Sequence, residues 1–219
     1  RKQVKAPERA EEMAEIVRVE WGLGTNPIPN VIEMLEENEV KVIEIEASDK
    51  FDGLSTWVND DIPVAVVNES FTIERKRFTA LHELGHLMMN IKIDDGKELE
   101  KTCHRFAGAL LFPAAEVRKT LGDKRSNVAM GELVAVKEEY GISVQATMRR
   151  AFDLGIISPL SFKQFCIKMA SNKKETGLGA YAGEEKSTRL LQLVFRLFAE
   201  AVISEPKAAA LSGMDSSTF

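Results

Sequence analysis

Residues 78–90 read FTALHELGHLMMN, a composition that core packing alone does not explain. Two of the chain's three histidines, His82 and His86, stand here four residues apart, with Glu83 beside the first. On a helix this spacing places both imidazoles on one face, one turn apart, where they can bind a single metal ion. The stretch therefore predicts a helix of the HExxH type found in hydrolytic metal sites.

The pattern around the motif predicts a helix from Ile73 to about Ile91. Counting 100° per residue, one broad face collects five apolar side chains, and the histidines fall on the opposite face. The apolar residues are Ala80, Leu81, Leu84, Leu87 and Met88. We expect this helix to be buried on one side and to present its histidines on the other.

A catalytic zinc ion takes three protein ligands and leaves a fourth position for water, so HExxH needs one more donor. The candidates are Glu100, His104, Cys103, Asp94 and Asp95. Glu100 and His104 share one face of the helix predicted at 98–113, so either could bind the metal while the other supports it. Cys103 points away from that face and reads as an inert buried thiol.

The adjacent carboxylate, Glu83, would be the general base that deprotonates the bound water and passes the proton to the leaving amine. The competing interpretation is a coincidence of two core histidines, because HExxH arises by chance in on the order of one chain in a hundred. The apolar flanks and the small Gly85 between the histidines favour a buried active-site helix.

The rest of the chain predicts an α+β fold, with a small, mostly antiparallel sheet packed on the HExxH helix. A helix at 7–20 and one opened by Asn30 or Pro27 precede strands at 40–47, 54–58 and 62–69. Helices follow, with Ser143 a plausible N-cap. We expect a zincin-like metallopeptidase domain at 1–125, a helical extension at 126–170, a flexible linker at 171–183 and a C-terminal helical segment at 184–219. The apolar helix at 188–203 suggests a core element or a homodimer contact.

Composition narrows the class of protein. A net charge of −5 and a pI near 5.4 disfavour a surface built to bind nucleic acid. The two cysteines form no CxxC pair and read as reduced thiols. Without a long apolar run or a signal peptide, the chain is expected to be cytoplasmic and to have no membrane partner. Its start at Arg1 suggests a fragment of a longer protein.

Two motifs together resemble the ImmA/IrrE-type metallopeptidases: RFTALHELGHLMMN at 77–90 and ELEKTCHRFAGALLFP at 98–113. The resemblance implies zinc as the cofactor, with His82, His86 and Glu100 as ligands and Glu83 as the catalytic glutamate. Two positions depart from the family's pattern. Cys103-His104 replaces an alanine and an asparagine, and Asn90 stands where a histidine is common. His104 is therefore either a supporting residue or an alternative ligand.

The resemblance also implies partners. Family members are similar to enzymes that cut helix-turn-helix repressors, and many carry a helix-turn-helix domain of their own. We expect that domain to be absent from this chain. Nucleic acid would be bound only through it. We expect a zinc-dependent endopeptidase acting on such a transcriptional regulator. The alternative is a regulatory interaction module that keeps the fold without hydrolysis. Tyr140, Tyr181 and His104 are all open as the group that stabilises the oxyanion.

Overall fold

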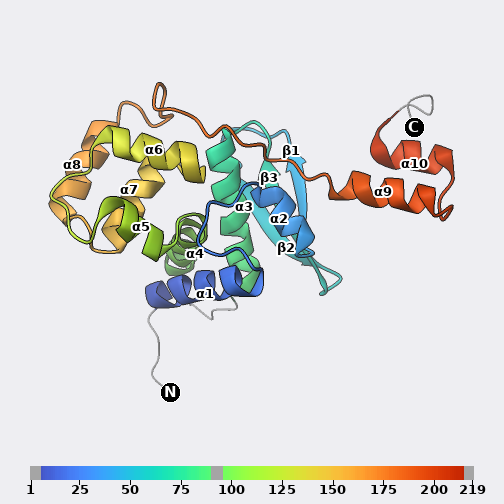
Figure 1. The fold of residues 1–219 in the computed structure, drawn as a ribbon, viewed down its shortest axis with the longest axis horizontal. Helices are drawn as coiled ribbons and strands as arrows, with labels where there is room; N and C mark the ends of the chain where they lie inside the picture. The colour runs from blue at the N-terminus through green and yellow to red at the C-terminus, as the bar shows by residue number, and fades with distance from the viewer. Residues whose placement is uncertain (1–5, 90–95, 215–219) are drawn as a thin grey trace, which may run out of the picture.

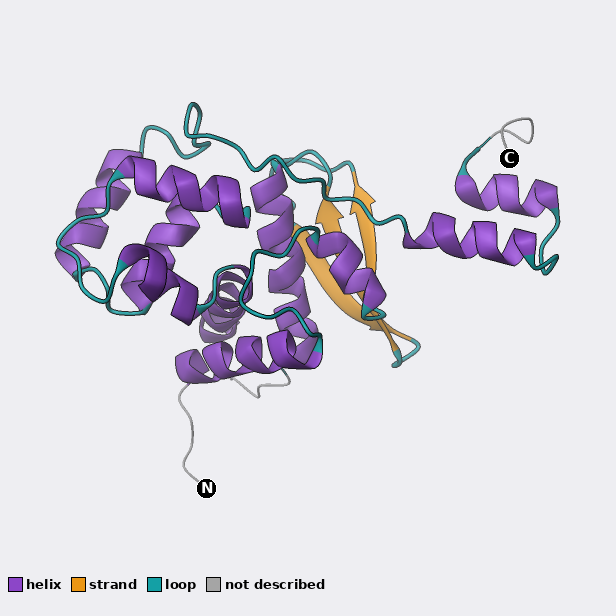
Figure 2. Cartoon of the chain, in the orientation of Figure 1, coloured by secondary structure: helices purple, strands orange, loops and turns teal. Residues whose placement is uncertain are grey.

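The computed structural model describes residues 6–89 and 96–214 and has a three-stranded sheet beside its central helix (Figures 1 and 2). The strands are β1 (Lys41–Ile45), β2 (Gly53–Val58) and β3 (Ile62–Asn68), in the order β1-β3-β2. The helices are α1 (Ala6–Glu20), α2 (Val31–Glu37), α3 (Ile73–Met88), α4 (Gly96–Leu111), α5 (Ala114–Leu121), α6 (Met130–Tyr140), α7 (Val144–Asp153), α8 (Pro159–Met169), α9 (Arg189–Ala199) and α10 (Glu205–Ser212). The predicted α+β class is confirmed.

The sheet has one antiparallel and one parallel pairing. β2 and β3 form the expected antiparallel hairpin, in which Asn59 and Asp60 adopt φ values of 53° and 63°. Such left-handed turn residues match the twist of the flanking strands. β1 pairs in parallel with β3. The sheet is thus mixed rather than mostly antiparallel, because the connection at 46–52 carries the chain past the position that β3 later occupies.

Helix α3 is held between the sheet and α4. It contacts β2, β3 and α4, and α1 packs on α4. Leu81 and Leu84 are buried in the core, as predicted. Gly85 faces α4, where a Cβ atom would lie 3.2 Å from the Phe106 ring and 3.3 Å from Cys103 Cβ. The glycine therefore allows the two helices that carry the candidate site to approach closely.

The helix starts agree with the predicted caps. Asn30, rather than Pro27, caps α2, and its side chain accepts the N–H of Glu33 at 3.0 Å. Ser143 caps α7 and accepts the N–H of Ala146 at 3.1 Å. Both side chains satisfy N–H groups that lack a partner within the helix.

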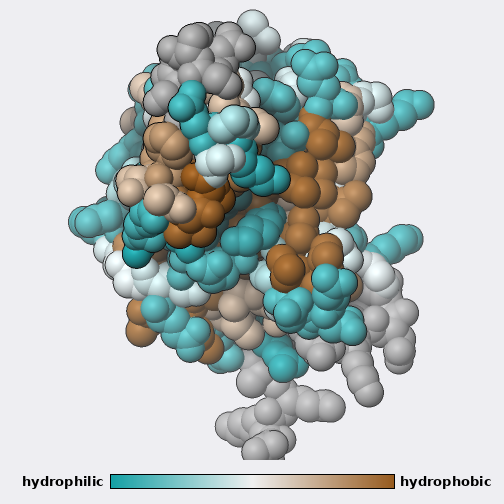
Figure 3. Space-filling model, turned by 90° about the vertical axis from the view of Figure 1, so that its right-hand side faces the viewer, coloured by the Kyte–Doolittle hydropathy of each residue, from teal (hydrophilic) through white to brown (hydrophobic). Residues whose placement is uncertain are grey.

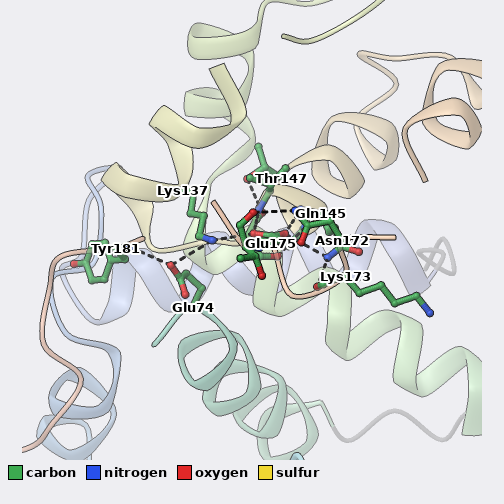
Figure 4. A network of polar contacts seen from close by, with 12 residues as sticks. Glu74, Lys137, Gln145, Thr147, Asn172, Lys173, Glu175 and Tyr181 are labelled. Carbon is green, nitrogen blue, oxygen red and sulfur yellow. Dashed lines mark hydrogen bonds and ion pairs between the residues drawn. The ribbon is translucent and has the colours of Figure 1, made fainter. Parts of the chain in front are cut away.

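The segment at 171–183 contains no helix or strand, and it contacts the body through buried polar groups. Glu175 accepts the N–H groups of Val144 and Gln145 at 3.1 and 2.9 Å and pairs with Lys137 at 3.0 Å (Figure 4). The N–H of Tyr181 donates to Glu74 at 3.0 Å. These contacts run along the starts of α3 and α7. Whether the segment is flexible stays a prediction, as do the domain boundaries.

A second buried glutamate follows the segment. Glu185 accepts the N–H groups of Val31 and Ile32 at 2.9 and 3.1 Å and forms an ion pair with Arg77. The carboxylate thus lies at the N-terminus of α2, where negative charge is favourable. Beyond it, α9 and α10 form a hairpin that extends away from the rest of the protein (Figure 1). Across the described residues, each helix is too short or too polar to cross a bilayer.

Candidate active site

Helices α3 and α4 bring together three side chains that could hold a metal ion: His82, His86 and Glu100. One donor atom from each lies within 4.8 Å of the others. The two histidine Nε2 atoms are 3.1 Å apart. The Glu100 carboxylate places one oxygen 3.1 Å from His82 Nε2 and the other 3.2 Å from His86 Nε2. The HExxH spacing therefore aims the two histidines of α3 at one point, and the packing of α4 on α3 brings Glu100 to the same point.

The chemistry of these donors fits a bound cation. Burial, together with the nearby His104 and His86, lowers the pKa of His82 to about 3, so this imidazole is neutral. Imidazole nitrogens and a carboxylate that converge on one point are donors that suit a cation. Three donors bound tetrahedrally at about 2.0–2.2 Å would lie roughly 3.3–3.6 Å apart, slightly more than the 3.1–3.2 Å between their nitrogen and oxygen atoms here. Glu100 is half exposed, which leaves one side of the cluster open to solvent.

Glu83 lies between α3 and β2, beside this cluster. It is buried, and the Ser55 hydroxyl donates to its Oε2 atom at 2.8 Å. Burial raises the pKa of Glu83, while the hydrogen bond from Ser55 and the nearby His86 act in the opposite direction. Gly53 leaves room for the carboxylate, because a Cβ there would lie 3.2 Å from Glu83 Oε1 and 2.7 Å from the Val66 carbonyl oxygen. Strand β2 therefore positions the carboxylate that the motif predicts as the base.

His104 lies against the cluster rather than within it. Its Nδ1 is 2.7 Å from the Glu100 carbonyl oxygen. Since a carbonyl only accepts, Nδ1 carries the proton. Its ring centroid is 4.3 Å from that of His82. This arrangement supports the chain next to Glu100 and favours the supporting role over ligation.

Among the other third-ligand candidates that the structure describes, Cys103 does not join the cluster. Cys103 is fully buried against Gly85, and burial raises the pKa of its thiol to about 12, as expected for an inert thiol. Asp94 and Asp95 lie outside the described residues.

The three oxyanion candidates separate clearly. Tyr140 is buried with its ring on Phe112, at a centroid distance of 4.4 Å. The Tyr181 hydroxyl donates to the Pro29 carbonyl oxygen at 2.8 Å. Of the three, His104 lines the pocket around His82, His86 and Glu100. His104 is therefore the candidate that could reach a reacting carbonyl, and the two tyrosines are not.

A pocket of about 470 Å³ surrounds the cluster and adjoins a larger pocket of about 730 Å³. Both are lined by Arg75, Phe78 and His104. The larger pocket is lined by eight lysines and arginines but by four aspartates and glutamates, although the whole chain carries a net charge of −5. Six of the eight cations form ion pairs with carboxylates, so the excess positive charge of this basic extension of the cleft comes from Lys173 and Lys174.

Sequence reasoning missed two residues that lie beside Glu83, Ser55 and Gly53, and one residue that anchors α3, Arg77. Ser55 and Gly53 carry no signal of their own, because one polar residue and one glycine are common in any edge strand. Arg77 is fully buried at the first turns of α3 and donates to the Ile28 carbonyl oxygen at 2.6 Å. Arg77 is the first residue of the RFT part of the motif, and its place in the motif could have identified it.

Comparisons with known proteins agree with the motif. Residues 35–152, more than half of the chain, match the Peptidase_M78 family, described as the IrrE N-terminal-like domain. No curated protein matches the chain. A solved structure, a transcriptional regulator from Mycobacterium tuberculosis, shares 14% identity with a TM-score of 0.47. The match covers 65% of this chain and 46% of that one, so the chain spans less than half the regulator's length. A structural likeness this weak supports no argument about function.

Proposed function

The chain belongs to the Peptidase_M78 family of IrrE N-terminal-like domains, and from that premise we propose that it is a zinc-dependent endopeptidase. The observation that carries the proposal is the convergence of His82, His86 and Glu100 beside the buried Glu83. A metal-binding role alone would not require a carboxylate held next to the ligands. A general base that acts on water requires one.

Two imidazole nitrogens and one carboxylate oxygen form a ligand set that suits zinc in catalytic sites. When bound, zinc would supply a Lewis acid that polarises the peptide carbonyl and makes water more acidic. His82 and His86 would bind through Nε2, the atoms that face each other in the structure. Glu100 would complete the set from α4.

Glu83 would take the proton from the attacking water and pass it to the leaving amine. Ser55 donates to Oε2 of this carboxylate and so fixes its orientation. Oε1 is the atom that faces the position where Gly53 lacks a side chain. Ser55 therefore acts as a positioning residue for Glu83.

The cleft suits a peptide segment, and its basic extension favours acidic side chains in that segment. Lys174 lines the larger pocket, and no described residue pairs with its ammonium group. A transcriptional regulator of the helix-turn-helix type, the substrate that the motif resemblance implies, is the protein substrate that we propose.

The test is cleavage of a defined mixture of synthetic peptides, followed by mass spectrometry. The zinc-loaded chain should cut a subset enriched in acidic residues next to the scissile bond. Cutting should stop on adding a chelator and return on adding zinc. Peptide cleavage that persists unchanged in excess chelator would contradict the proposed metal dependence, and a folded, zinc-loaded chain that cuts no peptide would favour a regulatory module without hydrolysis.

A further inference from the structure

The outward face of the sheet is apolar and uncovered. We define the outer sheet face by five side chains that are 38 to 48% exposed: Ile43, Ile45, Leu54, Val58 and Ile62. Ile43 and Leu54 both lie opposite Val66, so one aliphatic row crosses all three strands. The neighbouring positions point the other way, as shown by Ser55, which reaches Glu83 on α3. The outer sheet face is therefore a continuous apolar surface turned away from the active site.

The α9–α10 hairpin buries few apolar side chains of its own. Its buried apolar side chains, within the part that the structure describes, are Val194, Ala208 and Ala209. Leu190, Leu193, Val202 and Leu211 are 41 to 64% exposed. Helices of 11 and 8 residues are marginal in water without packing. The hairpin therefore needs a second apolar surface.

The hairpin cannot cover the outer sheet face of its own chain while its start stays where it is. The Ser187 and Thr188 hydroxyls donate to Glu36 and Glu33 of α2, each at 2.9 Å. Arg189 pairs with Glu39 at 2.5 Å. These contacts fix the first turn of α9 on α2, and the hairpin then runs away from the sheet (Figure 1). Figure 3, which views this end of the molecule, shows hydrophobic side chains gathered in separate areas.

We propose that the α9–α10 hairpin of one chain packs on the outer sheet face of a second copy, and that the exchange is reciprocal. A two-fold dimer satisfies both surfaces at once, because each chain supplies one hairpin and one sheet face. The partner is a second copy of this chain because the two surfaces match in chemistry and in size.

The sizes agree by simple geometry. Three strands about 4.8 Å apart, with a mean length of about 20 Å, present roughly 285 Å². Two helices side by side, each about 10 Å wide and with a mean length of about 14 Å, also present roughly 285 Å². Each chain would thus contribute a footprint of about 570 Å², and the total of about 1,140 Å² clears the ~1,000 Å² expected of a biological interface. A one-sided contact would supply half of this and fall in the range of weak encounters.

The experiment uses the 219-residue chain and three variants, with mass measured by light scattering during gel filtration. Leu54→Asp alters the sheet face, Leu193→Asp alters the hairpin, and Ile167→Asp, on the 66% exposed side chain in α8, is the matched control. Wild type and control should run at about twice 24.3 kDa. Each interface variant should dissociate at least about tenfold more readily, because a carboxylate would be buried without a partner. Circular dichroism and zinc content should be unchanged, which shows that each variant is folded.

Mixing the two interface variants tests the exchange itself. The intact hairpin of Leu54→Asp can pack on the intact sheet face of Leu193→Asp, so the mixture should form mixed dimers more tightly than either variant dimerises alone. These should stay weaker than the wild-type dimer, because only one of the two contacts is intact. A monomeric wild type at tens of micromolar would overturn the proposal. So would a Leu54→Asp variant that stays dimeric, since hairpins would then pack on each other. None of these outcomes depends on peptidase activity.

Discussion

Replacing Glu185 with glutamine tests whether the chain between α8 and α9 is bound to the body of the protein. Glu185 is 3% exposed, and its partner Arg77 is fully buried. The glutamine carbonyl can still accept the N–H groups of Val31 and Ile32, so the cap on α2 is largely kept. What is lost is the negative charge beside a buried guanidinium.

The magnitude follows from that loss. Breaking a buried ion pair by removing one partner costs about 3–5 kcal/mol. Arg77 keeps its hydrogen bonds to the Ile28 and Tyr140 carbonyl oxygens, which favours the lower end of this range. For a protein of this size, each kcal/mol shifts the melting temperature by roughly 2–4 °C. With a loss of about 3 kcal/mol, the variant should therefore unfold roughly 6–12 °C below wild type.

The assay is thermal unfolding followed by circular dichroism, with Glu184→Gln as the control. Glu184 is the exposed neighbour in the same segment, and its replacement should change stability by no more than about 0.5 kcal/mol. Equal melting temperatures for the two variants would refute the reasoning. They would mean that the ion pair between Glu185 and Arg77 does not hold the segment in solution.

Three further predictions concern the active site. Ser55→Ala should keep zinc but lower kcat/KM about tenfold, because Glu83 loses the hydrogen bond that orients it. Unchanged kinetics would show that Ser55 does not position Glu83. Gly53→Ala should destabilise the protein by about 1–3 kcal/mol and lower the hydrolysis rate, because its methyl group would press on β3 and Glu83. An unchanged melting temperature and rate would show that this contact is not tight. Glu100→Ala should lose zinc, measured by elemental analysis, more severely than His104→Ala, and the reverse ranking would make His104 the ligand.

Local patterns predicted most of the fold. The α3 helix, its buried face and the histidines on the other side follow from residue spacing alone, and so does the Ser143 cap. The hairpin between β2 and β3 was readable from its turn residues. These features depend on neighbours within a few residues, which is the range that periodicity and turn chemistry cover.

Features that depend on distant parts of the chain were not readable. The parallel pairing of β1 with β3 is decided by where a loop crosses, and no residue of β1 encodes it. The polar segment after α8 looks like a linker because its composition is polar. Yet Glu175 and Glu185 are buried, since each meets a helix N-terminus and a cation far away in sequence. A single sequence does not show which charges find such partners.

In the candidate site too, residues within one helix turn were predicted and residues brought together by packing were not. His82, Glu83 and His86 were predicted from one helix turn, and the motif resemblance placed Glu100 on the next helix. Their roles stay predictions, although the geometry brings the three donor atoms together. Ser55 lies 28 residues from Glu83 in the chain, and only the packing of β2 on α3 brings them into contact.

The most direct test of the central claim measures zinc content and peptide hydrolysis on the same preparations of wild type and Glu83→Gln. Both proteins should contain about one zinc ion per chain, because the three ligands are untouched. Wild type should cut the peptide mixture and the variant should not, because the base alone is removed. A variant that cuts at the wild-type rate, or a folded wild type that takes up no zinc, would contradict the account.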